Sequence, residues 1–146
     1  MQRPSHIPGM ADVAVHHLGV ADFRILADTD TTDGAFALGE FSGREGAWTV
    51  PHIHANSLEA FYVLEGRFTF TLGSDDLTAE PGAFVLIPKR TRHVMSAGAG
   101  GGRFLTFWTP GGLEQMFVEL GRLSADALRD PEMRRAISAR YDSIPT

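Results

Sequence analysis

The feature that most constrains the fold is a succession of short apolar segments, broken by Gly, Pro, Asp and Ser, between about residues 20 and 108. The clearest segment is RFTFTL at 67–72, where apolar and polar residues alternate. In an extended strand this alternation puts the apolar side chains on one face. Two further apolar runs, 83–87 and 103–108, are each followed within two residues by a proline. Short strands with turn residues between them predict an all-β sandwich or barrel.

Residues 111–146 have a helical pattern instead. Apolar residues at 113, 116, 117 and 120 form a stripe, and Asp130-Pro131-Glu132 reads as a capped helix start. We therefore predict an irregular arm over 1–19, a β-barrel over 20–110 with a Gly/Ala-rich loop at 97–102, and one or two C-terminal α-helices over 111–146. About 35 residues are too few for a separate core, so residues 1–146 are expected to form a single domain.

Composition excludes several classes of function. The chain has no cysteine, so a metal site must be built from His, Asp and Glu. A net charge of -5 argues against a nucleic-acid or anionic-membrane partner. No apolar run approaches the ~20 residues of a membrane helix, and the N-terminus lacks the apolar stretch of a secretory signal. We expect a cytoplasmic protein with a small-molecule substrate.

Four residues carry the candidate chemistry. His52 and His54 stand two apart, so on a strand both imidazoles face the same way. Glu59 follows a short turn, and His93 comes from a separate strand. Three imidazoles and one carboxylate suit one divalent transition metal ion, such as Fe, Mn, Co, Ni, Cu or Zn. Such an ion keeps open positions for water, dioxygen or substrate.

These ligands stand within two spaced motifs. The motifs read Gly46-x5-His52-x-His54-x4-Glu59-x6-Gly66 and Gly82-x5-Pro88-x4-His93. They resemble the paired motifs of the cupin superfamily, the first at every fixed position. The second departs twice, with Arg90 where a Gly is usual and Ala97 where an Asn is usual. The resemblance implies an antiparallel jelly-roll barrel with the metal inside it, and for a chain of this size a homodimer.

Candidate pocket residues follow from strand parity. Val50, Phe61 and Met95 each stand two residues from a proposed ligand, so they share a face with it. Arg90, in the basic turn before His93, is either a solvated loop residue or part of a positive rim that attracts an anionic substrate. Trp48 belongs to a set of large residues expected mostly in the core, of which some line the pocket. The other members are Phe61, Phe84, Met95, Phe104, Phe107 and Trp108.

Three hypotheses for the function stay open. The first is a dioxygenase acting on a flavonol-like, enolic or phenolic molecule, because the motifs and the run 109–114 resemble small cupins grouped with the quercetin 2,3-dioxygenases. In that reading Glu59 also takes the substrate proton. The second is a non-oxidative isomerase, cyclase or decarboxylase that uses the metal as a Lewis acid. The third is a metal- or ligand-binding barrel without activity. Oxygen consumption separates the first two.

Overall fold

The computed structural model describes residues 5–146, and strands make up most of its regular structure. The strands are β1 (Val15–His17), β2 (Ala21–Ala27), β3 (Ala37–Gly43), β4 (His52–Ile53), β5 (Leu58–Leu72), β6 (Asp75–Ala79), β7 (Phe84–Ile87), β8 (His93–Thr109) and β9 (Ile144–Pro145). The helices are the short 3-10 turns η1 (Met10–Asp12) and η2 (Ala139–Tyr141) and the α-helices α1 (Gln115–Leu120), α2 (Ala125–Arg129) and α3 (Pro131–Ser138).

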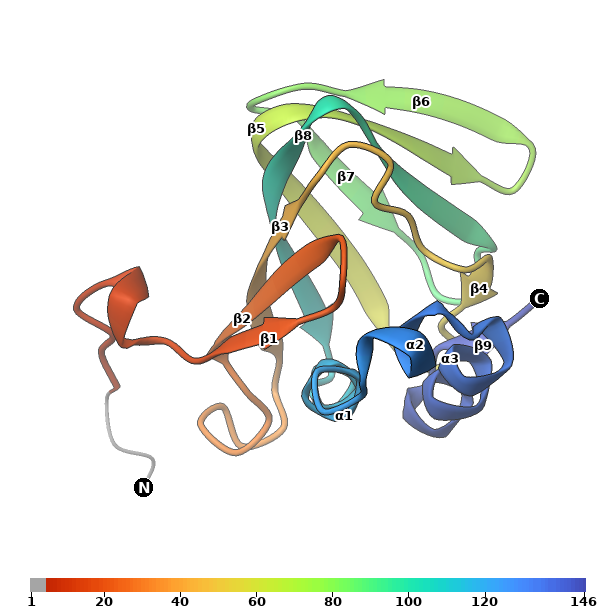
Figure 1. Cartoon of the computed structure of the whole chain (residues 1–146). Coiled ribbons are helices and arrows are strands. Elements are labelled where there is room, and N and C mark those ends of the chain that lie inside the picture. Colours follow the sequence, from red (N-terminus) through yellow and green to blue (C-terminus); the bar gives the residue numbers. More distant parts are fainter. Residues whose placement is uncertain (1–4) are drawn as a thin grey trace.

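All strand pairs described are antiparallel. The sheet follows the order β1-β2-β3-β8-β4-β9, and β5 pairs with β6, β7 and β8. The two long strands β5 and β8 run side by side and link the two halves of the sheet, which wraps around a common interior (Figure 1). The predicted antiparallel jelly-roll barrel is confirmed, and its interior is the place where inward-facing side chains of distant segments meet.

Aromatic residues fill the barrel. Phe68 and Phe70 of the alternating segment are fully buried, as their pattern predicts. Phe104 of β8 meets Phe61 and Phe68 edge to face, with ring centroids 5.0 Å apart in both pairs. Burying one such side chain contributes about 1.5–3 kcal/mol, so this cluster is a main source of the barrel's stability.

The Gly/Ala-rich segment 97–102 is part of β8, so the predicted loop is wrong. Its glycines allow strands to come closer than side chains permit. A Cβ atom on Gly66, where φ is +78°, would lie 2.1 Å from the Gly101 carbonyl oxygen. One on Gly101, where φ is +71°, would lie 2.2 Å from the Gly43 carbonyl oxygen. The composition that resembles a loop therefore serves a close approach of β3, β5 and β8.

The C-terminal segment is helical as predicted, but it forms three short α-helices rather than one or two, at one end of the barrel (Figure 1). The predicted start of α3 is confirmed, because the Asp130 side chain accepts the Glu132 N–H and Pro131 occupies the first turn. α1 packs on the barrel through Phe117, whose ring stacks on Phe23 of β2 at 4.2 Å between centroids. No helix within residues 5–146 is both long enough and apolar enough to cross a membrane.

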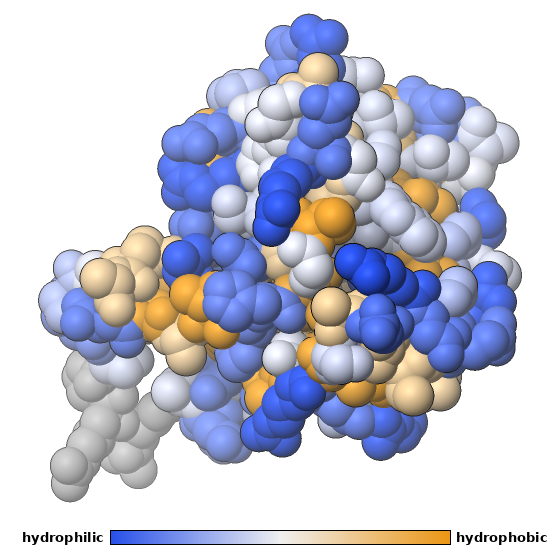
Figure 2. Space-filling view, viewed as in Figure 1, coloured by the Kyte–Doolittle hydropathy of each residue, from blue (hydrophilic) through white to orange (hydrophobic). Residues whose placement is uncertain are grey.

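Two further expectations need correction. Part of the predicted irregular arm, Val15–His17, pairs with β2, so His16 and His17 lie on a strand rather than in a loop; residues 1–4 lie outside the described part. Phe84, expected in the core, is 64% exposed. It sits on the outer face of β7 opposite Tyr62. On the face shown in Figure 2, polar residues are scattered, and apolar residues show between the barrel and the C-terminal helices.

Candidate metal centre

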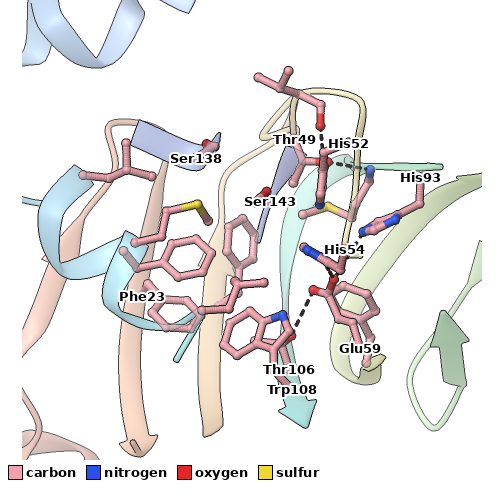
Figure 3. Close-up of a pocket in the computed structure, with 18 of the residues that line it drawn as sticks. Phe23, Thr49, His52, His54, Glu59, His93, Thr106, Trp108, Ser138 and Ser143 are labelled. Carbon is pink, nitrogen blue, oxygen red and sulfur yellow. Dashed lines mark hydrogen bonds and ion pairs between the residues drawn. The ribbon is translucent and has the colours of Figure 1, made fainter. Parts of the chain in front are cut away.

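The barrel brings the four predicted ligands to one point. His52 pairs with His93 across β4 and β8, and Glu59 comes from the inner face of β5. One potential ligand atom from each of His52, His54, Glu59 and His93 lies within 4.8 Å of the others. His54, Glu59 and His93 are each at most 5% exposed. Residues separated by up to 41 positions in the chain thus form one buried cluster that could hold a metal ion (Figure 3).

Backbone carbonyls orient all three imidazoles. The Nδ1 atom of His52 lies 2.6 Å from the Val50 oxygen, and that of His93 lies 2.8 Å from the Thr91 oxygen. His54 Nδ1 lies 2.8 Å from the Asp142 oxygen. A carbonyl oxygen only accepts, so each Nδ1 carries the proton. The Nε2 atoms are left to bind a metal, which is the arrangement that protein metal sites use to fix a ligand tautomer.

The Glu59 carboxylate lies between two of the imidazoles and interacts with both. Glu59 Oε2 lies 2.5 Å from His54 Nε2 and 3.2 Å from His93 Nε2. Burial alone would raise the pKa of Glu59, but the two histidines outweigh it and hold the pKa well below its usual range. Burial alone would lower the pKa of His54, yet Glu59 and the Asp142 carbonyl outweigh it and raise that pKa.

Glu59 forms hydrogen bonds with His54 and His93 and none with His52 among the described residues. Burial, followed by repulsion from His93, lowers the pKa of His52 to about 4 against the attraction of Glu59. His52 is therefore neutral at pH 7, the form that binds a metal. The donor set of three oriented imidazole nitrogens and one ionised carboxylate fits a borderline divalent ion such as iron, manganese, nickel or zinc.

Asp142 of the C-terminal segment forms hydrogen bonds with the turn that follows His54. Its carboxylate accepts the Ala55 N–H at 2.9 Å and the Asn56 N–H at 3.0 Å. It also accepts the Ser57 hydroxyl at 2.9 Å. Together with the carbonyl bond to His54, these contacts make Asp142 a positioning residue for the candidate ligand. Its backbone is in the left-handed region, with φ +58°.

A cavity of about 90 Å³ opens beside the cluster and is mostly apolar. Val50, Phe61 and Met95 line it, where strand parity places them. Trp48 and Arg90, the other two predicted pocket residues, do not line it. Arg90 takes a left-handed conformation with φ +64° in the turn after Pro88, which leaves its side chain exposed. Trp48 is 50% exposed, so it does not belong to the core either.

The family described as Cupin domain matches residues 41–110, the stretch that holds all four candidate metal ligands. The chain belongs to the cupin superfamily.

Relatives of this cupin have diverse activities. Quercetin 2,3-dioxygenase of Bacillus subtilis (strain 168) is 32% identical over 98 residues, which is 67% of this chain but only 29% of that protein's length. The polyketide cyclase RemF from Streptomyces resistomycificus is 28% identical at a TM-score of 0.61, over 75% of this chain and 80% of its own. The structure of KdgF from Halomonas sp. has 18% identity and a TM-score of 0.66, over 73% of this chain and 94% of its own. This last likeness shows the fold alone.

Several polar residues of the cavity were not predicted. Thr106 donates its hydroxyl to Glu59 Oε1 at 3.4 Å. It shares the inner face of β8 with Phe104 and with Trp108, one of the large residues expected in the core or the pocket, so strand parity could have found it. Arg134, Ser138 and Ser143 also line the cavity. They lie in the C-terminal segment, and no spacing rule connects that segment to the motifs.

Proposed function

We propose that this cupin is a metal-dependent dioxygenase acting on a small enolic or phenolic substrate. The observation that carries the proposal is the cluster of His52, His54, Glu59 and His93 at the wall of a mostly apolar cavity. The relationship to a quercetin 2,3-dioxygenase supports the same reaction class. A bound transition metal supplies the Lewis acidity and the redox chemistry that such a reaction needs.

The chain's own residues would bind, orient and deprotonate the substrate. His52, His54 and His93 would hold a metal ion through Nε2, because their Nδ1 atoms donate to backbone carbonyls. Glu59 is the only carboxylate among the described residues that line the cavity. Its carboxylate faces the cavity and can accept the proton of a substrate hydroxyl, and Thr106 donates a hydrogen bond to its Oε1 at 3.4 Å.

The cavity favours a compact substrate. Its volume of about 90 Å³ lies well below the ~300–1,000 Å³ typical of sites for drug-sized ligands. Phe61, Met95 and Phe104 line it and exclude water from the reacting atoms. A small enol or phenol fits these dimensions better than a three-ring flavonol.

A second candidate is non-oxidative cyclisation or isomerisation with the metal as Lewis acid. The observation that favours it is the 28% identity to a polyketide cyclase over most of that protein. The two candidates use the same ligands and differ in the need for oxygen.

Oxygen uptake tests the proposal. Purified protein loaded separately with Fe(II), Mn(II), Co(II) and Ni(II) is given a panel of enolic and phenolic compounds, and dissolved oxygen and substrate are followed together. His54→Ala should abolish uptake, whereas His17→Ala, which changes a histidine with a side chain 75% exposed, should not. Substrate loss without oxygen loss would favour the cyclase reading. Oxygen uptake by the His54→Ala variant equal to that of the wild type would refute a role for the metal centre in either candidate function.

A further inference from the structure

An arginine lines the apolar cavity beside the metal centre. Arg134 of α3 is half-buried and shares this cavity with His52, His54 and Glu59. Its guanidinium carbon lies 6.0 Å from the centre of the Trp48 ring, at the outer limit of a cation–π contact. A charged side chain in an apolar site has to find a partner or lose solvation energy.

The partners of Arg134 do not neutralise it. Its Nη1 donates to the Leu128 carbonyl at 3.4 Å, a long hydrogen bond, and no carboxylate within the described residues 5–146 forms an ion pair with it. Burial lowers the pKa of Arg134 because desolvation disfavours the charged form. The next residue, Arg135, pairs with Glu132 at 3.0 Å in solvent. Arg134 is thus the arginine of α3 that lacks an anion.

Two hydroxyls of the C-terminal segment line the same cavity as Arg134. Ser138 stands one helical turn after Arg134, on the same face of α3. Ser143 follows η2 and is 4% exposed. Both line the cavity, and Figure 3 shows Ser138 on the opposite side of it from Glu59, with Ser143 between Ser138 and the histidines. The cavity therefore has two polar regions, with apolar residues such as Phe23 and Met116 also in its lining.

We propose that Arg134, with Ser138 beside it, binds a carboxylate of the substrate and so determines specificity for small organic acids. A guanidinium presents its N–H groups as a planar fork that matches the two oxygens of a carboxylate. The Ser138 hydroxyl adds a donor from the same helix face. The C-terminal helices then recognise one end of the substrate, and the barrel motifs hold the reacting end.

The inference rests on the proposed function for the role of the metal centre, and it narrows the substrate class. The substrate is a compact enolic or phenolic acid rather than a neutral flavonol. Its anionic group offsets the buried charge of Arg134, and its hydroxyl lies in the same cavity as Glu59. A neutral analogue of equal size leaves Arg134 without a partner, which makes discrimination against it strong.

Binding of a matched pair of probes tests the inference. Salicylate and salicylamide share the ring and the hydroxyl and differ in the carboxylate. Each is titrated by calorimetry into the purified wild-type protein, Arg134→Gln and Arg135→Gln, with metal content measured on the same samples. Wild type and Arg135→Gln should prefer salicylate. Arg134→Gln should lose about 10- to 100-fold of that preference at unchanged metal content.

The outcomes separate this inference from the proposed function. An unchanged preference in Arg134→Gln, or no preference for salicylate in the wild type, would overturn the carboxylate site whatever the oxygen measurements give. A loss confined to Arg134→Gln would support it even in a protein that consumes no oxygen. Should Arg134→Gln fail to fold, Arg134→Lys tests the same claim, because it keeps the charge, lacks the fork and should bind salicylate more weakly than the wild type.

Discussion

Replacing Asp142 by glycine should weaken both the fold and the metal centre. The change removes a carboxylate that accepts hydrogen bonds from Ala55, Asn56 and Ser57. Glycine adopts φ +58° without strain and keeps the carbonyl that orients His54, so the carboxylate alone is tested. At about 1 kcal/mol for each of the three bonds, the free energy of unfolding should fall by about 2–4 kcal/mol.

The metal affinity should fall as well. With the 55–57 turn released, His54 loses its fixed position, and loss of such supporting contacts lowers metal affinity by about 10- to 100-fold. Urea unfolding measures the first effect, and competition with a chromophoric chelator measures the second. Asp33→Gly is a matched control, because Asp33 has φ +52°, is exposed and lies outside the site. Wild-type metal affinity in Asp142→Gly would refute the positioning role.

Three further predictions concern stability and protons. Arg90→Gly should raise the free energy of unfolding by about 0.5–1 kcal/mol in thermal melts, since it relieves a left-handed backbone at φ +64°; a lower melting temperature would contradict this. Glu114→Ala should lower the free energy of unfolding by about 2–5 kcal/mol in denaturant titrations, because the fully buried Glu114 carboxylate accepts hydrogen bonds from the Thr29 and Gly112 N–H groups. Glu114→Gln should lower it by less. Metal affinity should increase as pH rises through the raised pKa of His54, because the metal ion displaces the proton on that imidazole. Calorimetry in buffers of different ionisation enthalpy should detect proton release near and below that pKa. A metal affinity that does not depend on pH would contradict this prediction.

The local patterns predicted the short strands and the common orientation of His52 and His54, because both depend on residues close in sequence. His93 stands 41 positions after His52, and only the resemblance to the cupin motifs connected the two. The strand pair His52-x-His54 and the alternation at 67–72 need only the twofold period of a strand. The composition of residues 97–102 predicts a loop, since glycine usually marks a break, yet in the fold the glycines of this segment let three strands pack closely. Hydrophobicity predicts a buried Phe84, yet the residue is exposed, because hydrophobicity alone does not tell which face of a strand is covered.

The contribution of the C-terminal segment could not be predicted. Asp142 meets the His54 turn across 85 to 88 residues, and Arg134 reaches the cavity only because α3 lies at the open end of the barrel. Such contacts are set by how helices dock on a barrel, and no periodicity or spacing encodes that docking. The residues that we propose to determine specificity are therefore the ones that only the structure shows.

Metal content is the most direct test of the central claim. Elemental mass spectrometry on tag-free wild type, His54→Ala and His17→Ala, each reconstituted with divalent ions and desalted, gives the number of ions per chain. The account predicts about one transition metal ion per chain in the wild type and His17→Ala, and a loss of it in His54→Ala. Stoichiometric zinc alone would favour the non-oxidative candidate. No bound metal in the wild type, or full occupancy in His54→Ala, would contradict the account.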